Sequence, residues 1–291
     1  MHGILLVDKP QGPSSHDVVA RVRRVLGLRA VGHAGTLDPG AGGLLVIAVG
    51  VATRWLPYLP GAKSYRAVLR LGTATDTEDI WGRVVESSDE EPPSSGAVRE
   101  ALEGLVGLKE QVPPMVSALK VDGKRLYELA REGLHVERAP RPVEISAVRV
   151  LAVEGNEAVF EVDCGPGTYV RSLCVEAGRR LGRPACMAGL RRLRACGFDV
   201  EDALPEAKWE TEALKAALRD HSRALTFLEE KVLDGEEAGH VLHGRTLAAP
   251  AEAELRTLRL TWDGRLLALA EAGPKGGLRP KRVFMDSACD C

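Results

Sequence analysis

The sequence predicts an α+β fold, with a central mixed, mostly antiparallel β-sheet flanked by helices and a small β-rich C-terminal module. Over the first two thirds of the chain, apolar runs of strand length alternate with amphipathic helical stretches. After about residue 224 the pattern changes to short strands around an Asp-Gly turn. The expected divisions are a domain at 1–204, a linking helical region at 205–223, a module at 224–286 and a tail at 287–291.

The first predicted elements are a strand and a helix. Residues 3–7 (GILLV) form a short apolar strand that ends at the Gly/Pro turn 8–13. Ser14 or Ser15 then caps a helix whose apolar residues recur at helical spacing. Gly27 is the expected residue just past its C-terminus.

Two strands and a second helix follow. The glycine-dense loop 32–43 leads into the continuous apolar run 44–49 (LLVIAV), which is typical of a central strand. Residues 65–71 predict another strand, and 87–96 a polar surface connection. The next helix is expected to bury one face, formed by Val98, Leu102, Leu105 and Val106.

The last third of the large domain begins with a segment of different composition. Residues from about 108 to 142 carry prolines near both ends and basic residues between them, which is typical of a mobile, protruding segment. Residues 158–164 alternate as a strand, and Thr168 is expected to cap the helix that follows. Further along, 258–269 predict a hairpin with its turn at Asp-Gly.

Composition excludes several classes of protein. The chain has 291 residues, 45% of them hydrophobic and 27% charged, which excludes a disordered, collagen-like or coiled-coil protein. No apolar run approaches the 18 or so residues of a membrane span, and Asp8 and Lys9 interrupt the N-terminus too early for a signal peptide. We therefore expect a cytoplasmic protein without a membrane partner.

Familiar cofactor and metal motifs are absent. The six cysteines contain no C-x-x-C pair, so no metal site is expected, and the Cys289/Cys291 end is interpreted as a frayed tail. No G-x-x-x-x-G-K-[ST] motif or complete G-x-G-x-x-G fingerprint occurs, which argues against an ATPase or a dinucleotide enzyme. No H-x-E…C-x-x-C pattern of a zinc deaminase occurs either.

The net charge of −2 conceals a segregation of charge along the chain. Between Arg171 and Arg194 there are seven arginines and only one acidic residue, Glu176. A polyanion responds to this local field rather than to the total charge. The cluster is therefore compatible with a nucleic-acid partner, although a simple preference for arginine would produce it too.

The densest unusual motif surrounds one carboxylate. Asp38 lies in the glycine-rich loop 32–45, directly before Pro39, which favours an extended backbone at Asp38. Glycines at this density let the backbone approach a ligand closely. Taken alone, the Asp-Pro-Gly sequence is most simply a turn.

Seven segments, in order, carry a more specific signal: DKPQGPSS (8–15), GHAGTLDPGAGGLL (32–45), KSYR (63–66), GTATDTED (72–79), MVSALKVDGKRLY (115–127), GTYVRSL (167–173) and LRRL (190–193). Together they resemble the TruB-type tRNA pseudouridine synthases over roughly residues 3–204. The β-rich remainder resembles, more weakly, a PUA-like RNA-binding module.

The resemblance implies the pseudouridine-synthase fold and an isomerase that acts on tRNA. Such enzymes convert a uridine at position 55, in the T-loop, to pseudouridine. They flip the base out, break the N1–C1′ bond and join C5 to C1′. The reaction needs no cofactor, and the partner is the tRNA T-arm stem-loop. The 108–142 segment would clamp over the T-loop, and neither an obligate protein partner nor an oligomer is required.

By the same resemblance, Asp38 is the essential carboxylate. It would attack C1′ or C6, or remove the C2′ proton, and residue identities do not choose among these roles. All three require the ionised form, which an ordinary aspartate adopts at neutral pH. Arg171 is implied to be its basic partner. Tyr65 is implied to stack on the uracil, and its phenol is the nearest acceptor for the C5 proton.

Five further residues are implied to contact the substrate. Leu190 forms the apolar wall opposite Tyr65, and Tyr169 and Asp79 line the pocket. His33 fills the stack that the flipped base leaves, because an imidazole can stack on bases. Lys9, in the first of the seven segments, is also placed at the substrate.

Basic residues outside the pocket are expected to contact phosphates, so that binding weakens with salt. They are Arg21, Arg24, Lys120, Lys124, Arg125, Arg179, Arg180, Arg191 and Arg192.

Two other functions stay open at this point. A non-catalytic tRNA-binding folding chaperone would keep the base-flipping residues, but it would not need a carboxylate in a polyanion site. A guide-RNA-dependent pseudouridine synthase subunit would share the core motifs, and the absence of long basic extensions favours the stand-alone form.

Overall fold

The computed structural model describes residues 1–117, 119–121, 123–134, 136–220, 225–248, 256–273 and 276–284, with only the backbone of Lys120, Val121 and Arg131. The predicted tail at 287–291 lies outside the described residues. Within those residues, no helix is long and apolar enough to cross a membrane.

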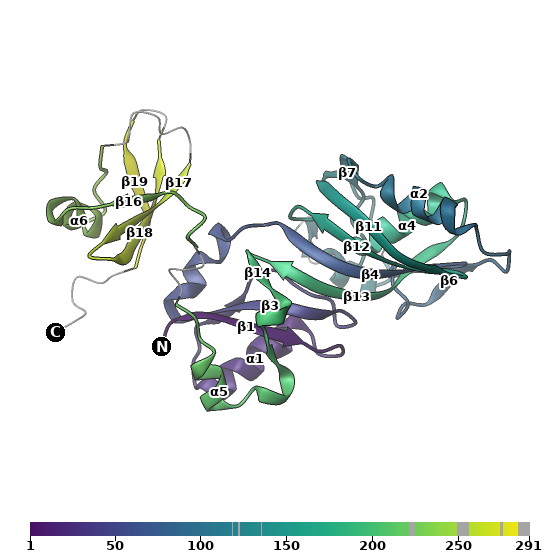
Figure 1. Cartoon of the computed structure of the whole chain (residues 1–291), viewed down its shortest axis with the longest axis horizontal. Coiled ribbons are helices and arrows are strands. Elements are labelled where there is room, and N and C mark those ends of the chain that lie inside the picture. Colours follow the sequence, from purple (N-terminus) through teal and green to yellow (C-terminus); the bar gives the residue numbers. More distant parts are fainter. Residues whose placement is uncertain are drawn as a thin grey trace.

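A nine-stranded sheet forms the centre of the large domain (Figure 1). Its strands are β1 (Gly3–Lys9), β2 (Val31–His33), β3 (Gly42–Val49), β4 (Lys63–Leu71), β11 (Ile145–Glu154), β12 (Glu157–Cys164), β13 (Ala185–Ala195), β14 (Phe198–Asp199) and β15 (Leu204–Pro205). The order along the sheet is β11-β12-β4-β13-β3-β1-β15, with β2 on β3 and β14 on β13. Only β1–β15 and β13–β3 pair in parallel. The predicted α+β class with a mixed, mostly antiparallel sheet is therefore confirmed.

Local sequence explains the first helix and the central strand. Helix α1 (Ser15–Leu26) begins with a capping box, in which Ser14 Oγ accepts from Asp17 N and the Asp17 carboxylate accepts from Ser14 N. Gly27, at φ +64°, ends the helix in the left-handed conformation. Strand β3 is buried throughout, as its continuous apolar sequence predicts.

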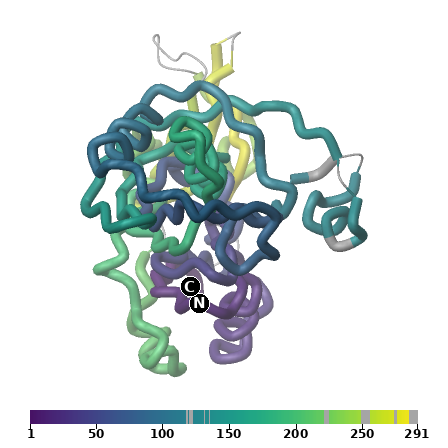
Figure 2. The backbone as a smooth tube through the Cα atoms, turned by 90° about the vertical axis from the view of Figure 1, so that its right-hand side faces the viewer, coloured from purple at the N-terminus to yellow at the C-terminus, as the bar shows by residue number. Residues whose placement is uncertain are grey.

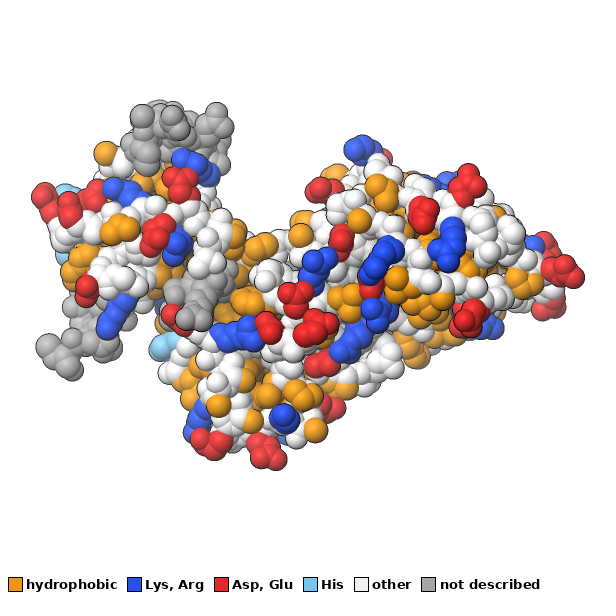
Figure 3. Space-filling model, in the orientation of Figure 1, with side chains coloured by type: hydrophobic (Ala, Val, Ile, Leu, Met, Phe, Trp, Pro, Cys, Tyr) orange, Lys and Arg blue, Asp and Glu red, His pale blue; other side chains and the backbone are white. Residues whose placement is uncertain are grey.

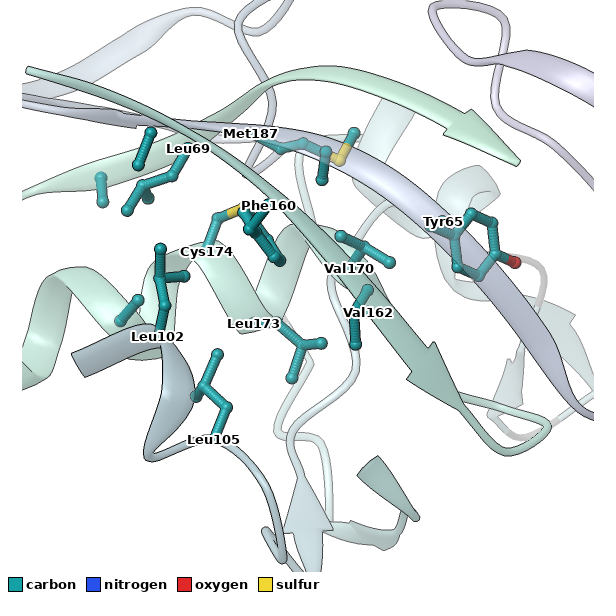
Figure 4. Packing of buried hydrophobic residues seen from close by; sticks show 14 of the residues in the cluster. Tyr65, Leu69, Leu102, Leu105, Phe160, Val162, Val170, Leu173, Cys174 and Met187 are labelled. Carbon is teal, nitrogen blue, oxygen red and sulfur yellow. The ribbon is translucent and has the colours of Figure 1, made fainter. Parts of the chain in front are cut away.

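Helices α2 (Ser95–Glu103) and α4 (Val170–Arg180) bury their apolar residues with one face of the β4, β12 and β13 sheet (Figure 4). The prediction for the first of them was wrong at its end: α2 stops at Glu103, so Val106 is exposed. The predicted cap of the second was wrong by one residue, because Tyr169, without a side-chain cap, is the N-cap of α4.

Short elements connect these layers. They are η1 (Gly50–Tyr58), β5 (Thr73–Thr75), β6 (Val84–Ser87), β7 (Glu110–Gln111), β8 (Lys120–Val121), β9 (Lys124–Arg125), α3 (Leu126–Arg131), β10 (Arg141–Pro142), η2 (Val200–Asp202), η3 (Glu206–Lys208) and α5 (Thr211–Ala216). The stretch that contains β8, β9 and α3 extends away from the body of the protein (Figure 2). Strands β7 and β10 pair at its base, so both ends of the stretch are anchored to one place.

The C-terminal part forms a separate four-stranded sheet. It contains β16 (Glu230–Val232), α6 (Gly235–Leu242), β17 (Thr257–Trp262), β18 (Arg265–Ala272) and β19 (Leu278–Val283). The predicted Asp-Gly hairpin is confirmed, with Asp263 and Gly264 both at positive φ between β17 and β18. Phe284 meets the buried Trp55 of the large domain edge-on, with ring centroids 5.0 Å apart. This contact joins the two parts through apolar packing.

Candidate active site

Asp38 lies in the loop between β2 and β3, and buried polar groups fix this loop from below. Lys9 Nζ donates to the carbonyl of Ala41 at 2.6 Å and to that of Pro10 at 2.9 Å. Ser15 Oγ accepts from Leu37 N and donates to Leu37 O. A loop held through its backbone on both sides of Asp38 presents this side chain in one position.

A buried arginine pairs with the carboxylate. Arg171, in the first turn of α4, places its Nε 3.0 Å from Oδ2 of Asp38. The guanidinium also donates to the carbonyls of Thr77 and Val116, both at 2.9 Å. Only 4% of the Arg171 side chain is exposed, whereas 38% of the Asp38 side chain is. The arginine is thus fixed inside the protein, and the carboxylate remains open to a ligand.

Two cavities meet at Asp38. A small one, of about 250 Å³, is lined by Asp38, Tyr65, Tyr169, Arg171 and Leu190, among others. A wide cleft of about 910 Å³ opens on the other side. Its walls come from the first turn of α1, the Asp38 loop, the 76–83 turn and the 115–134 stretch. The small cavity lies just below the usual range of about 300–1,000 Å³ for drug-sized ligands, which suits a single ring. The carboxylate therefore stands between a pocket for one ring and a cleft for a larger molecule.

An aromatic ring and an aliphatic side chain form apolar parts of the lining of the small pocket. Tyr65 is 7% exposed, and Figure 4 shows its ring at the edge of the core cluster with the hydroxyl directed away from the other labelled residues. Burial raises the pKa of the Tyr65 phenol, so it is protonated at neutral pH. Leu190, on the neighbouring strand β13, is partly exposed in the same pocket. Tyr169 exchanges two backbone hydrogen bonds with the Gln111 amide, which fixes the pocket wall.

His33 lines the wide cleft, as the resemblance implies for a stacking residue. Its ring meets that of His16 edge-on, with centroids 6.3 Å apart, and its Nδ1 makes no hydrogen bond to any described residue. Burial, together with the nearby His16 and Arg192, lowers the pKa of the His33 imidazole. The ring is therefore neutral at pH 7, which suits it to stacking on a base.

Three residues expected at the substrate or RNA contact other parts of the protein. Lys9 is fully buried under the Asp38 loop, and desolvation lowers its pKa to about 8. Arg192 is also fully buried and donates to the carbonyls of Leu44, Thr36 and Gly35, so its predicted phosphate contact is corrected. Asp79 lines neither cavity, and its carboxylate lies 3.9 Å from Nε of Arg171. All three position the loop or its arginine.

Two groups of predicted phosphate contacts lie beside the cleft and on α1. Arg125 lines the wide cleft, Lys124 is exposed beside it and the side chain of Lys120 lies outside the described residues. On α1, Arg24 is exposed, and Arg21 pairs with Glu206 and lies over the Trp209 ring. The cleft does not include them.

The arginines of the charged cluster do not converge on the cleft. Arg179 and Arg180 both pair with Glu176 at the end of α4 that lies opposite Arg171. Arg191 forms a two-pronged pair with Asp8 on the face of β13 opposite Leu190. That face carries acidic and basic side chains in alternation (Figure 3). Helix and strand geometry therefore disperse the cluster, and the phosphate contacts expected of Arg179, Arg180 and Arg191 stay predictions.

Among the residues that line the cavities but were not predicted from the sequence are one lysine and one histidine. Lys63 lies in the small pocket and His16 in the wide cleft. The signal for Lys63 was its spacing, because residues two apart on a strand share a face and Lys63 precedes Tyr65 by two. His16 lies in the first turn of a capped helix next to the loop, a place that only the folded chain reveals.

No metal site emerges from the described ranges, in which no group of three or more His, Cys, Asp or Glu side chains is placed to hold an ion. Cys164, Cys174, Cys186 and Cys196 are free and buried. The chemistry that this site offers is that of a carboxylate, a guanidinium and a phenol around a ring-sized pocket.

The chain is similar in sequence to known proteins of one family. Residues 23–170 match the model of the TruB family pseudouridylate synthase (N terminal domain). A tRNA pseudouridine synthase B of Aromatoleum aromaticum is 42% identical over 285 residues, covering 97% of this chain and 92% of the relative. One from Syntrophotalea carbinolica is 51% identical over 205 residues, 70% of this chain and 67% of the relative.

A solved structure has a similar fold. A chain in the crystal structure of a Cbf5-Nop10-Gar1 complex superposes with a TM-score of 0.76 at 26% identity, covering 98% of this chain and 85% of that one.

Proposed function

Because this chain belongs to the TruB family of pseudouridylate synthases, we propose that it converts the uridine at position 55, in the T-loop of tRNA, to pseudouridine. The observation that carries the proposal is the position of Asp38. It is ion-paired with Arg171, and it lies where a ring-sized aromatic pocket meets a wide cleft. A flipped uracil fits the pocket, and the RNA from which it comes fits the cleft.

The reaction begins when the target uridine leaves the T-loop stack, at a cost of a few kcal/mol. The neutral His33 ring, on the wall of the cleft, takes the vacated place between the bases. The uracil then lies between the Tyr65 ring and Leu190, with its ribose at Asp38.

Asp38 supplies negative charge at the ribose. As a nucleophile it would bond to C1′ or C6, and as a base it would take the proton from C2′; in each case an ionised oxygen acts. Arg171 pairs with the carboxylate and directs one oxygen, while the exposed part of the carboxylate faces the substrate. After the ring turns, C5 joins C1′ and loses its proton. The protonated Tyr65 phenol can relay this proton by giving up its own as it accepts the new one.

The wide cleft holds the rest of the T-arm. One wall is formed by the Asp38 loop and α1, and the other by the 115–134 stretch with Arg125 and Tyr127. Arg125 Cζ lies 5.8 Å from the centre of the Tyr127 ring, so a charge for phosphate and a ring for stacking stand side by side. We propose that this stretch closes on the T-loop.

Tritium release tests the proposed function. The purified chain is incubated with bare tRNA transcribed with 5-tritiated uridine, without any other protein or RNA. We expect one tritium released per tRNA and none from a tRNA with cytidine at position 55. Tight binding of tRNA without release would favour the folding chaperone, and release only after addition of a guide RNA would favour the guide-dependent subunit.

Arg125, on the outer wall of the cleft, is the subject of a separate prediction about the salt dependence of tRNA binding. Arg125→Met is expected to weaken tRNA binding and to reduce the slope of log K against log salt by about 0.7–0.9, the amount for one lost phosphate contact. Arg66→Met is the matched control, because Arg66 is also exposed but lies on the opposite face of the sheet and pairs with Glu161. Filter binding at four or more salt concentrations measures both. An equal slope change in the two variants would remove Arg125 from the RNA interface.

A further inference from the structure

We propose that Lys63 is the cation that holds the uracil ring after its bond to C1′ has broken. This inference rests on the proposed function and adds a substrate contact to it. Two properties of Lys63 suit it to this role: where its side chain lies and which groups it contacts. The third reason is the charge that the released base carries.

The position of Lys63 is fixed by the sheet. It is the first residue of β4, and its backbone pairs with Cys164 on one side and with Ala195 on the other. Strand alternation places its side chain on the same face as Tyr65, in the pocket that also contains Asp38 and Leu190. The aliphatic stem lies over Gly35, where an added Cβ would be only 3.2 Å from Cε of Lys63. The amine is therefore carried to the pocket on a packed stem.

The surroundings of the amine leave it capacity for a ligand. The structure shows one hydrogen bond from Nζ, to the carbonyl of Gly61 at 2.8 Å, and an ammonium group has three donors. Within the described part of the chain, no carboxylate lies at ion-pair distance from Nζ. The charged and titratable groups around it are Arg192, which opposes its charge, and the thiols Cys164 and Cys196. Burial lowers the pKa of Lys63, since the pocket penalises its charge.

An unpaired, partly buried cation gains most from an anion, and the reaction creates one in this pocket. When the N1–C1′ bond breaks, its electron pair leaves with the base, and the uracil becomes an anion with charge on N1, O2 and O4. Where Asp38 acts on the ribose, C1′ is then either bonded to Asp38 or, after loss of the C2′ proton to Asp38, part of a double bond. Lys63 donates a hydrogen bond to O2 or O4 and keeps its proton.

The same contact serves the second half of the reaction. The anion forms the C5–C1′ bond with its own electrons while the bond from Asp38 to C1′ breaks or, on the double-bond route, while Asp38 returns its proton to C2′. The C5 proton then passes through the pocket to N1, so that atoms and charge balance without another reagent. A neutral uracil bound before cleavage gains less from an ammonium than the anion does. The contact therefore stabilises the cleaved state more than the bound substrate, which increases the rate rather than the affinity.

Lys63→Met tests the proposal, because methionine keeps an unbranched apolar stem and removes the charge. We expect the single-turnover rate of tritium release to fall about 10- to 150-fold, the loss that corresponds to one charge-assisted hydrogen bond. The Kd for tRNA should stay within about twofold, and Lys63→Arg should restore at least part of the rate. Lys208→Met, an exposed lysine outside both cavities, is the control for loss of one positive charge.

A purely structural role predicts another pattern. If Lys63 only braces the Gly61 turn, Lys63→Met lowers the thermal midpoint but leaves the single-turnover rate of the folded protein unchanged, and this result overturns the proposal. Failure of Lys63→Arg to recover any activity also overturns it. An inactive wild-type chain would overturn the proposed function and this inference with it, whereas an active wild type with an equally active Lys63→Met variant overturns this inference alone.

Discussion

Asp38→Asn abolishes tritium release from tRNA while tRNA binding is retained; we expect the rate to fall by at least about 10⁴-fold, as for loss of a nucleophile or base in other enzymes. Asparagine has nearly the shape of aspartate, so the loop that Lys9 and Ser15 hold should keep its conformation. The amide can neither form the bond to carbon nor take the C2′ proton. Rapid-quench assays under single-turnover conditions and filter binding separate the two effects.

The experiment needs a folded Asp38→Asn protein and a control variant that loses a carboxylate elsewhere. When the charge of Asp38 is lost, the buried Arg171 still has the Asp79 carboxylate 3.9 Å away. The free energy of unfolding should therefore fall only moderately. Asp163→Asn removes a similarly exposed carboxylate that pairs with Arg194 on the opposite face of the sheet. We expect this variant to keep wild-type activity. An active Asp38→Asn protein would exclude Asp38 from the chemistry.

Local sequence signals were sufficient where one segment decides its own structure. Ser14, Asp17 and Gly27 define both ends of α1 because caps act within one turn of the helix. A strand that is covered on both faces needs apolar side chains at every position. The continuous apolar run of β3 was therefore sufficient to predict a buried strand.

Local signals failed where long-range pairing decides the structure. Strand β13 carries three arginines, and we expected two of them, Arg191 and Arg192, to contact phosphates. In the sheet, Leu190 lines the pocket, Arg191 lies on the other face and Arg192 is buried against loop carbonyls. Strand alternation separates what is contiguous in sequence. Strand β11 was missed too, because its half-exposed pattern lacks a continuous apolar run.

The candidate site shows the same division. Asp38 and Arg171 are 133 positions apart, and no spacing rule connects them; the family resemblance predicted the pair, and the ion pair at 3.0 Å agrees with it. The resemblance also implied that Lys9 and Asp79 touch the substrate. A motif identifies residues that matter without showing whether they act on a ligand or on the backbone beneath it. Burial separates these two roles, and burial is a property of the fold.

Gly43→Ala has the largest expected effect on stability, because this residue lies where the two halves of the sheet join. Strands β3 and β13 pair there through only two residue pairs, Arg191 with Gly42 and Arg192 with Gly43. Gly43 has φ +101°, and an added Cβ would lie 2.3 Å from the carbonyl oxygen and 2.6 Å from the nitrogen of Arg192. Backbone atoms on a paired strand cannot rotate away as a side chain can. We expect a loss of at least about 4 kcal/mol in the free energy of unfolding.

Gly12→Ala is the control that separates backbone strain from the clash. Gly12 has nearly the same φ, +107°, but an added Cβ would meet nothing within 4 Å. Its cost is that of the backbone conformation alone, about 1–2 kcal/mol. Urea denaturation of both variants measures the difference, and equal losses would contradict the role given to the β3–β13 contact. Because Arg192 also holds the carbonyls of Gly35 and Thr36, displacement of β13 should move the Asp38 loop. We therefore expect Gly43→Ala, assayed below its unfolding midpoint, to lose activity as well as stability.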